Sequence, residues 1–264
     1  MFGKLLKYDF RSMLKQFAFI WPAALVLAIV NRFTLDGLDS TSSVGETTAG
    51  IAMLVYVAIL ISMFIVAVIF VIQRFYKGLL GDEGYLMHTL PVKPWQLIGS
   101  KLACALVVTV VNILVAILSI LLIVPWAASD LKELFEGFQY LFAHWNIQAT
   151  QIMIAMLEFI LFSLASFAVG YLHLYLSMAI GHLFNKNRVA MSVIAFIAIQ
   201  VLLSILGNIL ARPFSDLIYP AFSRLDGMPA YHISMWVLIA GEMILAAVYF
   251  VGTEYILRKR LNLE

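Results

Sequence analysis

The chain has 264 residues, of which 63% are hydrophobic and only 12% are charged, and its formal net charge is +2. With a mean hydropathy of +0.99, this composition excludes a soluble globular protein. The basic residues fall between the apolar runs instead of forming one patch, so nucleic acid is not an expected partner. We therefore expect an integral membrane protein in contact with a lipid bilayer.

Six apolar runs are long enough, or nearly so, to cross a bilayer as helices, which requires about 20 residues each. No run shows the two-residue alternation of a transmembrane barrel strand. The predicted fold is therefore an all-α membrane protein, with a single domain over residues 1–264 and six transmembrane helices. The predicted spans are 17–35, 51–72, 102–124, 152–180, 189–210 and 233–251.

Residues 1–16 precede the first span and are amphipathic. Phe2, Leu5, Leu6 and Met13 recur at helical spacing, with lysines and an arginine between them. This pattern predicts a helix lying in the membrane interface, although a simple topology anchor would also carry these charges. Charges throughout the segment argue against a cleavable signal peptide.

Most basic residues lie at the ends of the predicted spans that face one side of the membrane. All but four of the 17 lysines and arginines fall on the side that holds the N-terminus. Because basic residues are retained in the cytosol during insertion, both termini of this multi-pass protein are expected there. The four exceptions are Arg32, Lys132, Arg212 and Arg224.

Two of the predicted external segments are expected to contain ordered structure outside the spans. Residues 130–150 carry apolar and aromatic side chains at helical spacing, which predicts an interfacial helix. Residues 211–230 contain Pro213 and Pro220 and are too apolar for a free loop. We expect a short re-entrant or surface hairpin there.

Four polar residues within the spans are candidates for a site. Glu242 falls near mid-membrane, where a charge costs roughly 2.5–3.5 kcal/mol, so it should face protein or water, or be protonated. Glu158 falls near the outer end of its span and could reach the headgroups. Asn112 and His173 are expected to form hydrogen bonds between helices. The small residues Ser163, Ser166 and Gly170 permit close helix approach in the fourth span, as a packing or dimer face.

No recognisable catalytic motif is present. The sequence lacks GxxxxGK[ST], HExxH, GxSxG and CxxC, so the chain has no expected machinery for hydrolysing ATP, peptides or esters. Cys104 is the only cysteine, which excludes a disulfide or a cysteine metal site. We expect no catalytic, cofactor or metal residue on this chain.

The longest polar segment on the basic side covers residues 73–101. Asp82 and Glu83 favour a helix N-terminus, an apolar stretch follows, and Pro91 ends it. Pro94 suits the first turn of the next helix, which runs into the third span. The short helix could dock in a groove of a partner, pack beneath its own bundle or lie on lipid.

This segment also resembles a known family. Its sequence, GDEGYLMHTLPVKPWQLIGSKL, is similar to the segment between the second and third spans of small ABC-2-type permeases, the membrane subunits of bacterial ABC exporters. The opening MFGKLLKYDFRSMLKQF is similar to their N-terminal interfacial helix. The sequence departs from the family at Lys93, Pro94 and Trp95, where a serine usually caps the third helix.

The resemblance implies a division of labour between two kinds of subunit. A separate cytosolic ATPase would bind ATP and Mg, and two permease subunits, in a homodimer or heterodimer, would enclose an export pathway across a bacterial cell membrane. The resemblance assigns ATPase docking to a coupling helix at Gly81, Asp82, Glu83, Gly84, Tyr85, Leu86, Met87 and Leu90.

Two other classes remain open from the sequence. An ion- or proton-coupled secondary transporter would use Glu242, and Glu158 besides, but such proteins are usually built from inverted repeats, and we find no repeat. An intramembrane enzyme would need a paired catalytic motif, and none is present.

Overall fold

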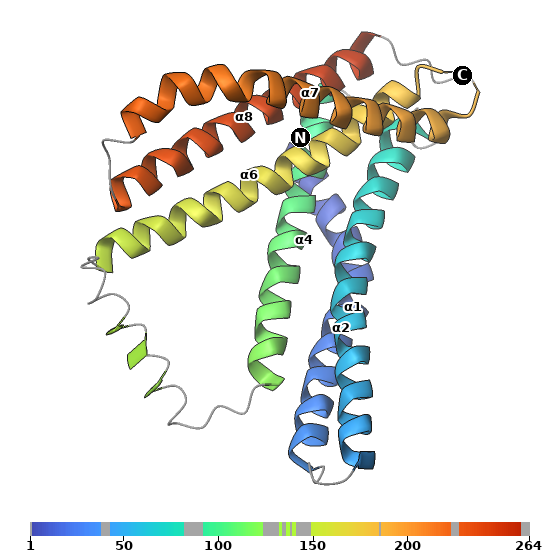
Figure 1. Cartoon of the computed structure of the whole chain (residues 1–264). Coiled ribbons are helices and arrows are strands. Elements are labelled where there is room, and N and C mark those ends of the chain that lie inside the picture. Colours follow the sequence, from blue (N-terminus) through green and yellow to red (C-terminus); the bar gives the residue numbers. More distant parts are fainter. Residues whose placement is uncertain are drawn as a thin grey trace. The chain divides into compact units, whose positions relative to one another are not determined.

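The computed structural model describes residues 2–37, 43–81, 92–123, 149–184, 186–222 and 227–259, together with short helical pieces at 132–133, 136–137 and 139–140. These residues are almost entirely helical and contain no strand. Five helices are long and apolar enough to cross a membrane, and a bent pair at the N-terminus brings the number to six if the pair is one span (Figure 1). The prediction of an all-α membrane protein is confirmed.

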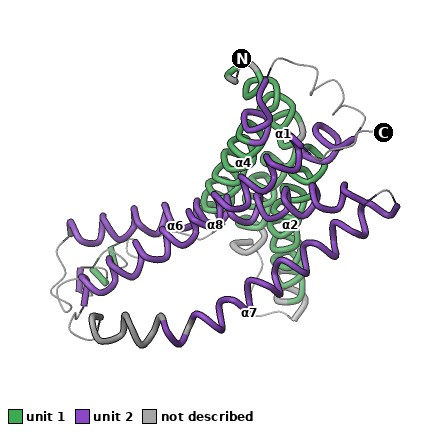
Figure 2. Tube along the Cα trace, turned by 90° about the horizontal axis from the view of Figure 1, so that it is seen from above, with its two compact units in different colours: residues 1–74, 99–137 green, residues 75–98, 138–264 purple. Residues whose placement is uncertain are grey.

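The chain divides into two compact units, which Figure 2 colours separately. The first unit comprises residues 1–74 and 99–137, and the second comprises residues 75–98 and 138–264. The first therefore holds α1 (Phe2–Gly37) and most of α2 (Ser43–Phe75) and of α4 (Pro94–Ile123). The second holds the π-helix η1 (Tyr76–Leu80), α6 (Ala149–Gly181), α7 (Arg188–Phe222) and α8 (Met228–Lys259).

Helix α1 combines the predicted interfacial helix and the predicted first span. Its two parts, Leu5–Lys15 and Phe17–Phe33, meet at an angle of 43°. Pro22 lies in the early turns of the second part, where its missing N–H does little harm. The predicted boundary at residue 16 thus falls at the bend.

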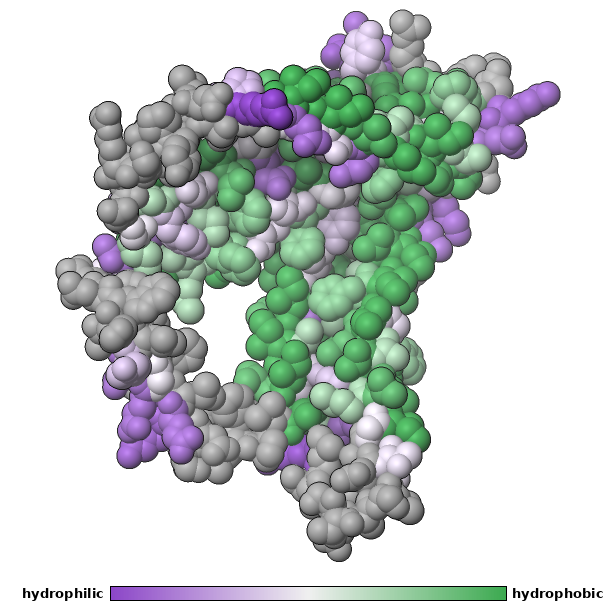
Figure 3. Space-filling view, in the orientation of Figure 1, coloured by the Kyte–Doolittle hydropathy of each residue, from purple (hydrophilic) through white to green (hydrophobic). Residues whose placement is uncertain are grey.

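The other spans match their predicted positions but extend further. The candidate spans are Gly50–Leu80, Pro94–Ile123, Thr150–Gly181, Arg188–Leu210 and Met228–Lys259. Hydropathy marks only the apolar part of a helix, whereas the backbone hydrogen bonds continue into polar turns. Large apolar side chains cover the outward sides of α2 and α4, as expected for surfaces that face lipid (Figure 3). Examples are Leu54, Ile61 and Leu114.

The predicted hairpin at 211–230 is wrong for residues 211–222. Helix α7 continues without interruption through Pro213 and Pro220 to Phe222. A proline removes one backbone hydrogen bond, and helices in or near a membrane tolerate this loss when neighbouring groups compensate for it. Most of the predicted interfacial helix at 130–150 lies outside the described residues.

The segment at 73–101 begins as a continuation of α2. That helix runs to Phe75, and η1 then carries the chain to Gly81, whose N–H donates a 2.7 Å hydrogen bond to the carbonyl of Tyr76. Gly78, Leu79 and Leu80 are buried, so this first part is not a polar surface loop. The predicted start of the next helix at Pro94 is confirmed. Residues 82–91 lie outside the described residues.

Candidate functional site

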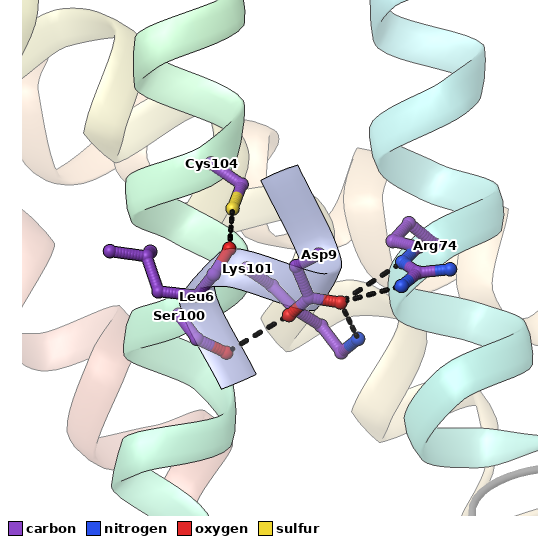
Figure 4. A network of polar contacts seen from close by, with 6 residues as sticks. All are labelled: Leu6, Asp9, Arg74, Ser100, Lys101 and Cys104. Carbon is purple, nitrogen blue, oxygen red and sulfur yellow. Dashed lines mark hydrogen bonds and ion pairs between the residues drawn. The ribbon is translucent and has the colours of Figure 1, made fainter. Parts of the chain in front are cut away.

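The most highly charged cluster among the described residues is built around Asp9 of α1. Figure 4 shows its carboxylate reaching between α2 and α4. Arg74 donates to Oδ1 through Nε at 3.1 Å and Nη2 at 2.7 Å. Ser100 donates its hydroxyl to Oδ2 at 3.2 Å, and Nζ of Lys101 lies 3.8 Å from Oδ1.

Burial makes this cluster energetically important. Asp9 is only 2% exposed and Lys101 is 4% exposed. Ions in such places are tolerated only when opposite charges and hydrogen bonds replace water. Two cations surround one carboxylate, and Arg74 is also favoured in the last turn of α2 by the helix dipole.

The cluster fixes both ends of the polar segment. Arg74 is the last residue of the first unit before the segment leaves it, and Ser100 and Lys101 follow its return at Gly99. One carboxylate on α1 therefore holds the outgoing and the returning helix. The 3.7 Å contact from Sγ of Cys104 to the carbonyl of Leu6 adds a second link between α1 and α4 (Figure 4).

Asp9 was not among the predicted site residues, and Arg74 and Lys101 were expected as topology signals within the polar segment at 73–101. A usable signal was present, since Asp9 stands four residues after Leu5 and four before Met13, on the apolar face of the N-terminal helix. An acid in such a stripe needs a buried cation as its partner.

The predicted intramembrane residue Asn112 also joins helices of the first unit. It is fully buried, and its Oδ1 accepts a 2.7 Å hydrogen bond from the indole Nε1–H of Trp21. A second link joins the hydroxyls of Tyr56 and Ser119 at 2.8 Å. The prediction that Asn112 makes a hydrogen bond between helices is confirmed.

In the second unit, aromatic rings attach η1 and its preceding residue to the end of α6. Phe75 stacks on Tyr175 with ring centroids 4.0 Å apart, and Tyr76 meets His182 edge-to-face at 5.1 Å. Burial lowers the pKa of the His182 imidazole and the charge of Arg188 lowers it further, against the effect of hydrogen bonds to the backbone. His182 is therefore neutral near pH 7.

The two candidate glutamates have different partners and do not meet each other. Glu158 of α6 lies 2.7 Å from Nδ1 of His232 of α8. Glu242 of α8 accepts a 3.0 Å hydrogen bond from the hydroxyl of Ser166 of α6. Neither geometry forms a paired-carboxylate catalytic site.

His173 lies among aromatic rings, and its imidazole also has the predicted kind of hydrogen bond between helices, to the backbone of Phe196 on α7. Its ring stacks on Phe196 at 4.3 Å and on Tyr249 at 5.3 Å. Its Nε2 and the hydroxyl of Tyr249 have no hydrogen-bond partner. Buried polar atoms of this kind usually bind an ordered water.

The residues predicted to dock an ATPase are described only at their start. Gly81 ends η1 in an extended conformation, and Asp82 to Leu90 lie outside the described residues. Within the described ranges, no group of three or more histidine, cysteine or acidic side chains could hold a metal ion.

The chain was also compared with known proteins. No family model matches the sequence, and neither the curated proteins nor the solved structures gave a match.

Proposed function

We propose that the chain is the permease subunit of an ATP-binding cassette exporter of the ABC-2 type. In this proposal the segment near Gly81 to Leu90 docks a separate cytosolic ATPase, which binds ATP and Mg. Two permease subunits form the export pathway, and each contributes six spans, with α1 supplying the first. Docking would bias the bundle between two states, according to the conformation of the ATPase.

The observation that best supports this proposal is the anchoring of residues 75–98 at both ends. Asp9 holds Arg74 on one flank and Ser100 on the other. A segment that transmits a partner's movement must be attached to the bundle by contacts that resist being pulled apart. A buried ion pair with hydrogen bonds fits this requirement better than exposed pairs, which contribute little.

A second attachment supports transmission into α6. The Phe75–Tyr175 and Tyr76–His182 ring contacts join the residues just before Gly81 to the last turns of that helix. A π-helix such as η1 is also a common location for a functional adjustment within a longer helix. Movement of the docked segment would therefore reach α6 directly.

The secondary-transporter alternative rests on Glu242 and gains one observation. The Ser166–Glu242 hydrogen bond gives the acid a polar partner inside the membrane-spanning part. However, α6 and α8 continue unbroken past Glu158 and Glu242. Transporters of that class usually bind their ions at broken helices, so the permease proposal remains the better supported of the two.

Substitutions in the segment test the proposal. We expect Leu86→Asp and Leu90→Asp each to abolish copurification of the ATPase while the chain remains inserted, because an apolar side chain of the proposed interface would become a charge. Affinity purification from membranes that contain both subunits measures this.

The matched control is Leu183→Asp in the turn between α6 and α7, where the leucine is 44% exposed. We expect this variant to copurify normally. Normal copurification of the Leu86 and Leu90 variants would refute docking through the segment.

A further inference from the structure

Helices α6 and α8 meet in a row of contacts between polar side chains, two made by hydrogen bonds and one by stacked rings. Glu158 pairs with His232, Ser166 with Glu242, and His173 with Tyr249.

The partners are separated by 74, 76 and 76 residues, respectively, so the two helices keep a nearly constant parallel register. At 1.5 Å per residue, the row extends about 22 Å along α6, from Glu158 to His173. We call this row the α6–α8 polar row.

Only the Glu158–His232 pair combines an acid with a base. Serine does not titrate in the physiological range, and His173 faces aromatic rings instead of a carboxylate. Histidine, by contrast, ordinarily exchanges its proton near pH 6.5. The Glu158–His232 pair therefore differs from the other two pairs of the row in its acid–base chemistry.

Burial and access are unequal within the pair. The Glu158 side chain is 1% exposed and that of His232 is 21% exposed. A buried carboxylate with so little access to water is strongly favoured to find a cation or to become neutral. His232 lies just before the predicted sixth span at 233–251, where its imidazole can exchange protons with water and then present its N–H to the carboxylate.

The surroundings of the pair are otherwise uncharged on its own helices. The Tyr231 ring packs edge-to-face on His232 at 5.7 Å. On α7, the charged side chain described near the corresponding end is Arg212, which is exposed. Arg212 has an interaction of its own, and Nδ1 of His232 lies 2.7 Å from Oε2 of Glu158.

We propose that Glu158 and His232 form a proton-binding site in which one bound proton fastens α6 to α8. A proton taken from water by the His232 imidazole creates an imidazolium that pairs with the Glu158 carboxylate. Loss of that proton leaves a neutral imidazole and a weaker contact. This site does not depend on the proposed ATPase.

A double-mutant cycle with Glu158→Gln, His232→Gln and the combined variant tests this site. Thermal midpoints are measured for the full chain in lipid nanodiscs. The non-additive part of the shift should be several degrees near pH 5.5 and less than half of that near pH 8.5, because the imidazolium is ordinarily lost in between. A coupling of zero, or one of equal size at the two pH values, would overturn the proposal.

The matched control is a cycle on the next pair of the row, with Ser166→Ala and Glu242→Gln. Its coupling should be the same at both pH values, because no base takes part. If a variant fails to fold, nitrogen NMR of isotope-labelled histidine in the wild-type chain replaces the cycle. His232 must then change from imidazolium to neutral imidazole over this pH interval, and an unchanged signal would exclude proton binding.

Discussion

The Asp9→Asn variant is expected to lose about 3 kcal/mol of stability, the cost typical of removing one partner from a buried ion pair. Asparagine keeps the size of the side chain but removes the negative charge from beside Arg74 and the buried ammonium of Lys101. Arg74 is 28% exposed and can turn toward water, whereas Lys101 cannot do so without local unfolding. Denaturation in detergent or nanodiscs measures the loss.

The control is Glu136→Gln in the exposed Lys132–Glu136 pair, which has a 3.6 Å separation. Solvent screens that pair, so its loss should change stability by no more than about 0.5 kcal/mol. Equal stability of Asp9→Asn and the wild-type chain would show that the cluster does not hold α1 against α2 and α4.

The Gly181→Ala variant is expected to lose about 1–3 kcal/mol, because a Cβ at this position would enter the backbone of α7. That atom would lie 2.5 Å from the backbone nitrogen and 2.7 Å from Cα of Ser192, in addition to overlapping its hydroxyl. Backbone atoms cannot move aside as a flexible side chain can, so the crossing of α6 and α7 must open. Thermal unfolding of the purified variant checks this.

Gly170→Ala on the same helix is the matched control, since a Cβ there meets nothing within 4 Å. Alanine favours a helix over glycine, so this variant should be unchanged or more stable by up to about 1 kcal/mol. A smaller loss at Gly181 than at Gly170 would contradict the close approach of the two helices.

The sequence predicted the positions of the helices well and their contacts poorly. Hydropathy locates apolar runs because the bilayer imposes a length on each span. It carries no information on which faces meet, so the close approach of α6 and α7 at Gly181 was not expected, whereas a Cβ at Gly170 meets nothing within 4 Å in this chain. The proline rule likewise predicted a break after residue 210 that α7 does not have.

For the polar residues, too, the sequence predicted their positions but not their contacts. Glu158, Glu242 and Asn112 stood out because each is costly in an apolar run, but their partners His232, Ser166 and Trp21 lie at least 70 residues away in sequence. The burial of Asp9 was not predicted because Asp9 belongs to a short segment in which charged residues are common. Only its position on the apolar face of α1 marked it for burial.

The central proposal is that the segment following Gly81 docks an ATPase, and photo-crosslinking tests it most directly. A photoreactive amino acid replaces Tyr85 in the full chain, irradiation is done in intact cells, and the crosslinked product is identified by mass spectrometry. The proposal predicts a crosslink to a polypeptide with a phosphate loop and an ABC signature motif, which the same probe at exposed Leu183 does not give. A correctly inserted chain that yields no such product at Tyr85 would contradict the proposal.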